Sequence, residues 1–140
     1  LELAAAKSKG AIPYSVTPDY TAKAREILGP EAWLCVEQKV CLTNIESEAR
    51  NVARKQMGRY LRWPNYLNNW MRMGFKEADL EGHGSSKFLD AMVCWGSEKR
   101  IMSYLEEHFS SGADHVVVQA LQPDGMEGTD FSVLQALAPK

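Results

Sequence analysis

The sequence lacks the features that mark membrane-bound, secreted and nucleic-acid-binding proteins. It has 16 basic and 18 acidic residues, and the formal net charge of −2 produces no field that would gather nucleic acid or an anionic membrane. No run approaches the roughly 18 apolar residues of a membrane-spanning helix, and no segment resembles a signal peptide. We therefore expect a cytoplasmic protein whose partners include neither nucleic acid nor a membrane.

Cysteine is scarce, and the three cysteines include no C-x-x-C pair. Cys35 and Cys41 are six residues apart, which on a strand places them on one face about 20 Å from each other. We predict buried thiols rather than a disulfide.

Recognisable metal and catalytic motifs are missing as well. The histidines at 83, 108 and 115 do not have the spacing of metal ligands, so we predict no metal site. No Ser/His/Asp set, nucleophile elbow or acid pair can be assembled. The loop 82–86 (GHGSS) precedes a helix and could hold a phosphate on its N–H groups, but its spacing fits neither a P-loop nor a dinucleotide motif. A flexible loop ending in a serine N-cap is the favoured interpretation.

What the sequence does contain is an alternation of strands and helices. Strand-like runs at 11–16, 33–42 and 114–121 are separated by helical segments, which is typical of a parallel α/β fold. The chain has no initiator Met and opens inside a helix-like run. Its 140 residues fall short of the roughly 250 of a complete barrel. We predict the C-terminal part of a (β/α)8 TIM barrel, covering residues 1–125, followed by a terminal helix or tail at 126–140.

Local signals predict where the helices begin. Thr17 caps a helix that runs from Pro18 to Leu28, Thr43 and Glu46 form a capping box for a helix that ends at Pro64, and Ser97 and Asp130 open later helices. Further helices are expected at 66–73 and 86–95. We expect the third strand to be buried on both faces. The helix after Ser97 is expected to turn four residues inward: Ile101, Leu105, His108 and Phe109.

The connection between the second and third strands is longer than a barrel crossover requires, at roughly 70 residues. The surplus, about 58–84, is predicted to lie at the carboxyl end of the strand, which is the catalytic face of a barrel. Its segment 62–72 combines amides, a phenol, guanidinium groups and indoles, which suits a flat, polar, anionic ligand. Alternatively, the tryptophans fill the core and Asn65 caps a helix.

Polar residues also stand at the carboxyl ends of the predicted strands. They are Tyr14 and Ser15, then Glu37, Gln38 and Lys39, then Gln119. A polar triplet within an apolar strand is costly to bury without partners, so Glu37 and Lys39 either serve a site or pair with neighbouring elements. Gln119 either points its carboxamide at a ring cofactor or caps its strand.

Several segments, taken in order, resemble the bacterial luciferase-like monooxygenase superfamily, in particular its F420-dependent oxidoreductase branch. They are GAIPYSVTPDYTAKAR at 10–25, EQKV at 37–40, NYLNN at 65–69, DAMVCWG at 90–96 and GADHVVVQ at 112–119. The resemblance covers about residues 1–122. The chain departs from it in carrying Ser8-Lys9-Gly10 where the family usually has Ala-Asp-Gly.

This resemblance implies a TIM-barrel oxidoreductase that performs hydride transfer or monooxygenation with a small-molecule substrate, using F420 or alternatively FMN. It implies that Tyr14, Gln38 and Gln119 bind the cofactor at the barrel mouth. It also implies that the segment 58–84 is the family's helical insertion, which helps close the substrate side of the pocket. That side would be shaped by Asn65, Tyr66, Asn69 and Arg72. The family's catalytic residues are expected upstream of Leu1, so the chain alone is expected to be inactive.

Two other hypotheses remain open. One is a catalytically incomplete remnant that persists as a homo-oligomer through its open sheet edges. The other is a compact α/β binding domain unrelated to the barrel, in which the helices of 58–84 cover those edges.

Overall fold

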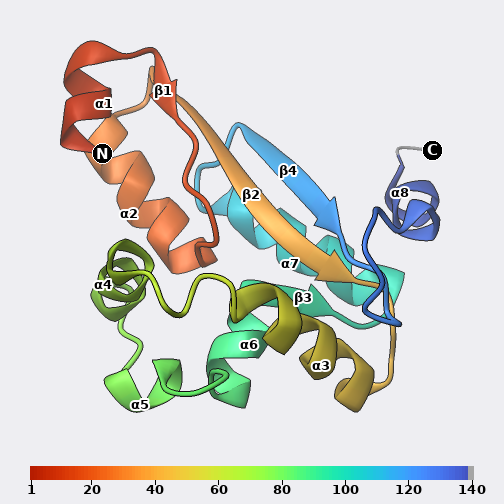
Figure 1. Ribbon diagram of the computed structural model, residues 1–140. Helices are drawn as coiled ribbons and strands as arrows, with labels where there is room; N and C mark the ends of the chain where they lie inside the picture. Colours follow the sequence, from red (N-terminus) through yellow and green to blue (C-terminus); the bar gives the residue numbers. More distant parts are fainter. Residues whose placement is uncertain (139–140) are drawn as a thin grey trace.

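The computed structural model describes residues 1–138 and has a mixed α/β architecture with a parallel sheet, as predicted (Figure 1). The strands are β1 (Gly10–Ala11), β2 (Trp33–Cys41), β3 (Val93–Trp95) and β4 (His115–Ala120). The helices are α1 (Glu2–Lys7), α2 (Pro18–Leu28), α3 (Glu46–Met57), α4 (Pro64–Arg72), α5 (Glu77–Leu80), α6 (Ser86–Met92), α7 (Glu98–Ser110) and α8 (Phe131–Leu137). Of the predicted tail 126–140, the last two residues lie outside the described part, and the division at 125 stays a prediction.

β2 is the centre of the sheet, and every other strand pairs with it in parallel. β4 runs along one edge of β2, from Cys35 paired with His115 to Val40 paired with Ala120. β1 and β3 share the other edge of β2. Alternate residues of a parallel strand direct their N–H and C=O groups to opposite edges, and the β2 residues that bond to β1 and to β3 are all odd-numbered. The N–H of Trp33 bonds to the carbonyl before β1, and the carbonyl of Cys41 accepts from the residue after β3.

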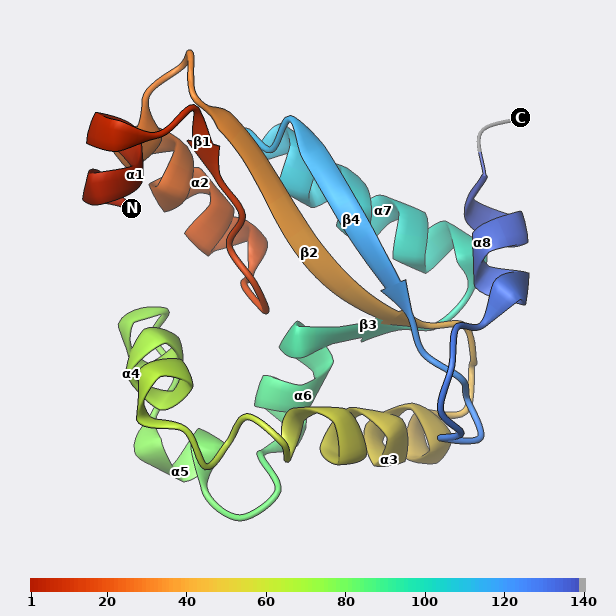
Figure 2. The ribbon, with the colours of Figure 1, turned by 45° about the horizontal axis from the view of Figure 1, so that its top comes forward.

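The two faces of β2 are covered by different helices (Figure 2). We call the face that carries Glu37 and Lys39 the inner face and the opposite one the outer face. On the outer face, Leu34 and Val36 pack with α2, and Val40 packs with residues of α7 and α8. The helices α3, α4 and α6 form a third cluster with Cys41 at the carboxyl end of β2. This third cluster lies on the side of the sheet where the site is found.

Within residues 1–138 the sheet is open, because one edge of β4 has no partner strand. The amide of Asp114 donates to the carbonyl of Leu34, so by alternation the N–H groups of His115, Val117 and Gln119 point to the other edge of β4. No strand within these residues pairs with that edge. The expectation that the strand is buried on both faces is wrong, because Val117 is 44% exposed. A strand is enclosed only when both of its faces have a covering layer.

Most predicted helix starts are confirmed by hydrogen bonds. Thr17, Ser97 and Asp130 each accept a bond from a first-turn amide of the following helix. The predicted capping box is wrong: α3 begins after Ile45, and the hydroxyl of Thr43 accepts from the amide of Ile45 and donates to Glu48. Thr43 therefore orders the turn before the helix.

Two predicted helices end earlier than expected. The helix predicted to reach Pro64 ends at Met57, and turns connect it to α4. The helix predicted over 86–95 ends at Met92, and Val93–Trp95 forms β3 against the carboxyl end of β2. Val93 and Trp95 belong to the β-branched and aromatic residues that suit a strand. They form one here because the edge of β2 is available for pairing.

Most of the side chains that were expected to be buried are buried. Ile101, Leu105 and His108 of α7 are buried as predicted, but Phe109 is 49% exposed, so its predicted inward position is wrong. Cys35, Cys41 and Cys94 are buried free thiols. No helix among residues 1–138 is long and apolar enough to cross a membrane.

Candidate functional site

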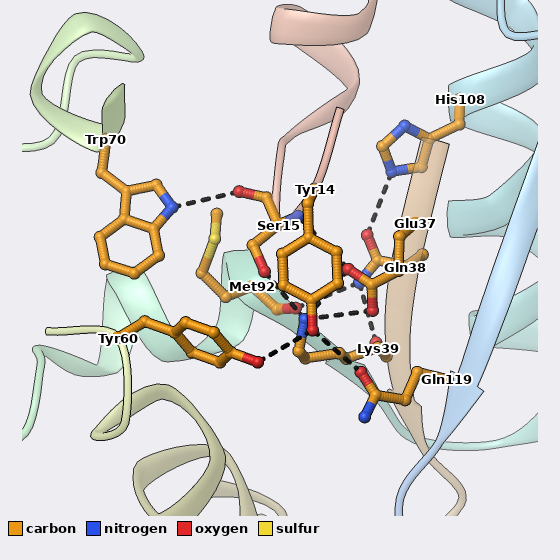
Figure 3. Close-up of polar contacts among 10 residues, drawn as sticks. All are labelled: Tyr14, Ser15, Glu37, Gln38, Lys39, Tyr60, Trp70, Met92, His108 and Gln119. Carbon is orange, nitrogen blue, oxygen red and sulfur yellow. Dashed lines mark hydrogen bonds and ion pairs between the residues drawn. The ribbon is translucent and has the colours of Figure 1, made fainter. Parts of the chain in front are cut away.

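The polar triplet of β2 is divided between the two faces of the sheet (Figure 3). Successive side chains of a strand point to opposite faces, so Glu37 and Lys39 share the inner face and Gln38 lies on the outer one. Glu37 and Lys39 meet the segment Tyr14–Ser15, which follows β1 and forms an isolated bridge from Tyr14 to Glu37. Two alternatives were open for Glu37 and Lys39. Their contacts with each other and with a neighbouring segment agree with the alternative that they pair with neighbouring elements.

Lys39 and Glu37 form a buried ion pair. The ammonium of Lys39 donates to both carboxylate oxygens of Glu37, at 3.1 and 3.0 Å, and to the hydroxyl of Ser15 at 2.8 Å. The side chain of Lys39 has no exposed surface. Burial lowers the pKa of Lys39, while the neighbouring carboxylate acts in the opposite direction. Removing one member would leave the other charge unpaired in the interior, which costs several kcal/mol (about 3–5).

The phenol of Tyr14 lies where β2 and β4 approach their carboxyl ends. Its oxygen is 3.0 Å from the hydroxyl of Tyr60 and donates to the amide oxygen of Gln119 at 3.4 Å. Burial, followed by the bond to Tyr60, raises the pKa of Tyr14 well above the usual value for a phenol. Tyr14 therefore keeps its proton over the physiological range and acts as a neutral hydrogen-bonding group.

Aromatic rings continue the site toward α4. Tyr60 packs against Tyr66 with ring centroids 4.8 Å apart, and Tyr66 packs against Trp70 at 5.6 Å. Trp70 is fully buried and its indole N–H donates to the carbonyl of Ser15 at 3.1 Å. The interpretation that a tryptophan of this segment fills the core is confirmed for Trp70, whereas Trp63 is 56% exposed.

Gln38 is bound to a different set of partners. Its amide oxygen is 3.1 Å from Nε2 of His108 in α7, and its amide nitrogen donates to the carbonyls of Lys39 and Met92. Nδ1 of the same histidine lies 2.9 Å from the hydroxyl of Thr21 in α2. Burial lowers the pKa of His108 to about 4, so the imidazole is neutral and joins α2, α7 and β2.

The residues predicted for cofactor binding are thus only partly brought together. Tyr14 and Gln119 are in hydrogen-bond contact on the inner face, but Gln38 is buried on the outer face with its amide groups bonded to other residues. All three stay predictions as cofactor ligands. Gln119 is partly exposed and does more than end a strand, because it receives the Tyr14 hydroxyl.

The four residues predicted for substrate binding all lie on α4, but they point in different directions. Tyr66 belongs to the aromatic row beside Tyr60, and Asn65 is exposed. Asn69 and Arg72 line a separate groove against α1 and α2. Asn65 does not cap the helix, because Pro64 is its first residue and Trp63 holds the N-cap position. The predicted substrate role of these four residues stays a prediction.

A cleft adjoins the Tyr14 group at the carboxyl end of β4. It lies between α3 and the loop 121–128, and Gln119 forms part of its wall. Its other polar side chains are Lys55, Gln56, Arg59, Gln122 and Glu127. The amine of Lys55 donates to the carbonyl of Gly125, and the guanidinium of Arg59 is 3.7 Å from the carboxylate of Glu127. The amides and the two cations outnumber this single carboxylate, so the cleft suits an anionic ligand.

Sequence reasoning placed Trp70 within the candidate segment 62–72 but did not include Lys55, Arg59 or Tyr60 among the site residues. In the sequence, Tyr60 recurs at helical spacing with the apolar residues at 49, 52, 53, 57 and 61, which indicates an inward position, while Lys55 and Arg59 fall outside that set. They become site residues only because the loop 121–128 folds over them. The loop 82–86 follows the favoured interpretation: Ser85 is the N-cap of α6 and accepts the amide of Phe88 at 3.2 Å.

The fold of this chain is found in solved structures. The chain is similar in structure to a solved F420-dependent secondary alcohol dehydrogenase in complex with an F420–acetone adduct, with a TM-score of 0.58 and 12% sequence identity. The match covers 99% of this chain and 46% of that one, so the chain spans about half the length of the solved structure it matches. No protein-family model and no curated protein matches the sequence. At this level of identity the likeness shows the fold.

Proposed function

We propose that this chain is the C-terminal part of a luciferase-like TIM-barrel oxidoreductase that uses F420, or alternatively FMN, to act on a small molecule. The observation that carries the proposal is the group Tyr14–Tyr60–Gln119, hydrogen-bonded near the carboxyl ends of parallel strands. This is the end at which α/β folds of the barrel type place their ligands. The structural likeness to an F420-dependent enzyme supports the same direction.

The residues at this end suit such a cofactor in their chemistry. F420 joins a planar ring to an anionic tail, and the cleft beside Gln119 combines amide side chains with the cations of Lys55 and Arg59. The phenols of Tyr14 and Tyr60 provide hydrogen-bonding groups beside it. When bound, the deazaflavin supplies the hydride chemistry.

In this proposal the chain's own residues bind and orient. Tyr60 donates to the oxygen of Tyr14, Tyr14 donates to Gln119, and the amide nitrogen of Gln119 remains to meet the ring or its substituents. Figure 3 shows this nitrogen pointing away from the Tyr14 hydroxyl. Tyr66 and its neighbours on α4 would form the substrate side, with Asn65, Asn69 and Arg72 as the predicted further contacts.

The test is a fluorescence titration of the full chain with F420 and, separately, with FMN. We expect F420 to bind, and Tyr14→Phe and Gln119→Ala each to weaken binding about three- to tenfold, because each removes one or two hydrogen bonds. Tyr104→Phe is the matched control, since its phenol bonds to the carbonyl of Ala91 away from the cleft. Binding of neither cofactor by a folded chain would refute the proposal for this chain.

The second candidate is the remnant that persists as a homo-oligomer. The free edge of β4 favours it, because three outward N–H groups and an exposed Val117 lie together there. The two candidates differ in one measurement, since the remnant binds neither cofactor at any state of association.

A further inference from the structure

Ser15 has an unusual backbone conformation for a side-chain-bearing residue. Its φ is 53°, and among residues 1–138 no other non-glycine residue has a positive φ. This left-handed region is sparsely populated by residues with a Cβ, so it persists only where the surroundings hold it. Ser15 is 3% exposed and follows Tyr14 directly. The direction of the Tyr14 side chain therefore depends on what holds Ser15.

Three polar atoms of Ser15 are each held by a different group (Figure 3). Its N–H donates to Oε2 of Glu37 at 3.3 Å, its hydroxyl accepts from Nζ of Lys39 at 2.8 Å, and its carbonyl accepts from Nε1 of Trp70 at 3.1 Å. Glu37 and Lys39 come from β2, whereas Trp70 comes from α4. Ser15 is therefore hydrogen-bonded to two elements that are far apart in the sequence, β2 and α4.

The ion pair is too enclosed to react with a ligand. The side chain of Lys39 has no exposed surface and that of Glu37 is 8% exposed. The ammonium of Lys39 lies 3.9 Å from the centre of the Tyr14 ring, so it also contacts the face of the phenol. The charges of the pair are directed at Tyr14–Ser15 and at each other.

We propose that Glu37, Lys39 and Trp70 are positioning residues that hold Ser15 in its left-handed conformation and so aim the Tyr14 phenol at Gln119, in the wall of the cleft. The inference rests on the proposed function for what the cleft binds, but the positioning itself concerns the chain alone. Tyr14 holds Gln119, which lines the cleft, and the other residues act through Tyr14.

The first test reads the position of Tyr14 without any cofactor. The ¹³Cζ NMR signals of labelled tyrosines are recorded for Trp70→Phe, which removes the indole N–H but keeps an aromatic ring, and for the double variant Glu37→Gln/Lys39→Met. Tyr14→Phe assigns the signal. We expect both variants to shift or broaden the Tyr14 signal and to leave that of Tyr104 unchanged. An unchanged Tyr14 signal in a folded Trp70→Phe overturns the proposal, even where the double variant fails to fold.

A second test asks whether the network holds the backbone of Ser15. Glycine adopts a positive φ without steric cost, so Ser15→Gly no longer needs to be held. The carbonyl that Trp70 binds is still present in that variant. We therefore expect Trp70→Phe to shift the Tyr14 signal less in the Ser15→Gly background than in the natural chain. An equal shift in both backgrounds contradicts the holding role.

The third measurement separates this inference from the proposed function. Titration of Trp70→Phe with F420 is expected to give about three- to tenfold weaker binding than the natural chain, matching the loss of the Tyr14 contact. Unchanged F420 affinity together with a displaced Tyr14 signal overturns the claim that the position of Tyr14 affects the ligand site through Gln119. If the natural chain binds no F420, the proposed function fails, and the NMR signals alone decide the positioning.

Discussion

At the scale of single residues, burial decides what each polar group can do. Lys39 and Glu37 neutralise each other, and the hydrogen bonds to Ser15 satisfy them further. Tyr14 stays protonated because burial raises its pKa. His108 stays neutral because burial lowers its pKa to about 4. The same desolvation thus widens the pH range over which a phenol and an imidazole stay uncharged, and a charged pair persists only where the two charges are in contact.

His108 makes stability depend on pH. Its pKa is about 4 in the folded chain and about 6.5 when unfolded, so the unfolded state binds more protons as pH falls. Its contribution is complete above pH 6.5 and is lost between pH 6.5 and 4, by up to about 3 kcal/mol. Urea denaturation at several pH values should show this loss in the natural chain but not in His108→Gln. The matched control is His115→Gln at an exposed position, and an equal pH dependence in His108→Gln would contradict the prediction.

At the scale of elements, local capping sets the helix starts and tertiary pairing sets several ends. Ser97 and Thr17 each accept a hydrogen bond from an amide in the first turn of the following helix. Such a bond depends only on the short side chain and the local turn, so it can be predicted from the sequence. β3 is different, since Val93–Trp95 follows α6 without a break and becomes a strand beside β2. A preference for strand is expressed there because an edge is available.

Two serines of α7 test the capping argument. Ser97→Ala removes the side-chain acceptor for the amide of Arg100 and should lower the free energy of unfolding by about 1 kcal/mol. Ser103→Ala is the matched control inside the same helix, at an exposed position, and should be neutral or slightly stabilising. Chemical denaturation of both variants measures the difference. Equal effects would mean that Ser97 does not act as a cap.

At the scale of the whole molecule, the inner face is covered at one end and open at the other. The helices α3, α4 and α6 gather at the carboxyl end of β2, beside the Tyr14 group. Toward the other end, Ile12, Trp33 and Val117 are exposed by 67, 53 and 44%. The rings of Trp33 and His115 stack there with centroids 5.8 Å apart. An apolar sheet face beside an unpaired edge favours association.

The open edge leads to a prediction about assembly. If chains associate through β4, Val117→Lys should shift the population toward the monomer, because a charge at the centre of the strand opposes edge pairing. Light scattering over a range of concentrations gives the molar mass. Leu3→Lys is the control, since Leu3 is 75% exposed on α1. A mass that is the same for Val117→Lys and the natural chain would place any association elsewhere.

The candidate site could be found only in part from the sequence. Tyr14 and Gln119 were recognisable as polar residues ending strands, and they do meet. Gln38 occupies the same strand, but the two-residue period of a strand turns it to the opposite face, toward His108. The sequence did not indicate Lys55 and Arg59 as site residues, because charged residues on a helix are usually part of the solvent-exposed surface. They line the cleft only because the loop 121–128, distant in the sequence, lies beside them.

The sequence by itself determined the α/β class, the helix starts at Thr17, Ser97 and Asp130, and the buried thiols, because these follow from local hydrogen bonding and hydrophobic pattern. Only the tertiary structure decided that β3 forms, that β4 joins the edge of β2 opposite to β1, and that Ser15 is held in a left-handed conformation. These features depend on contacts between residues up to about a hundred positions apart, which no local preference specifies.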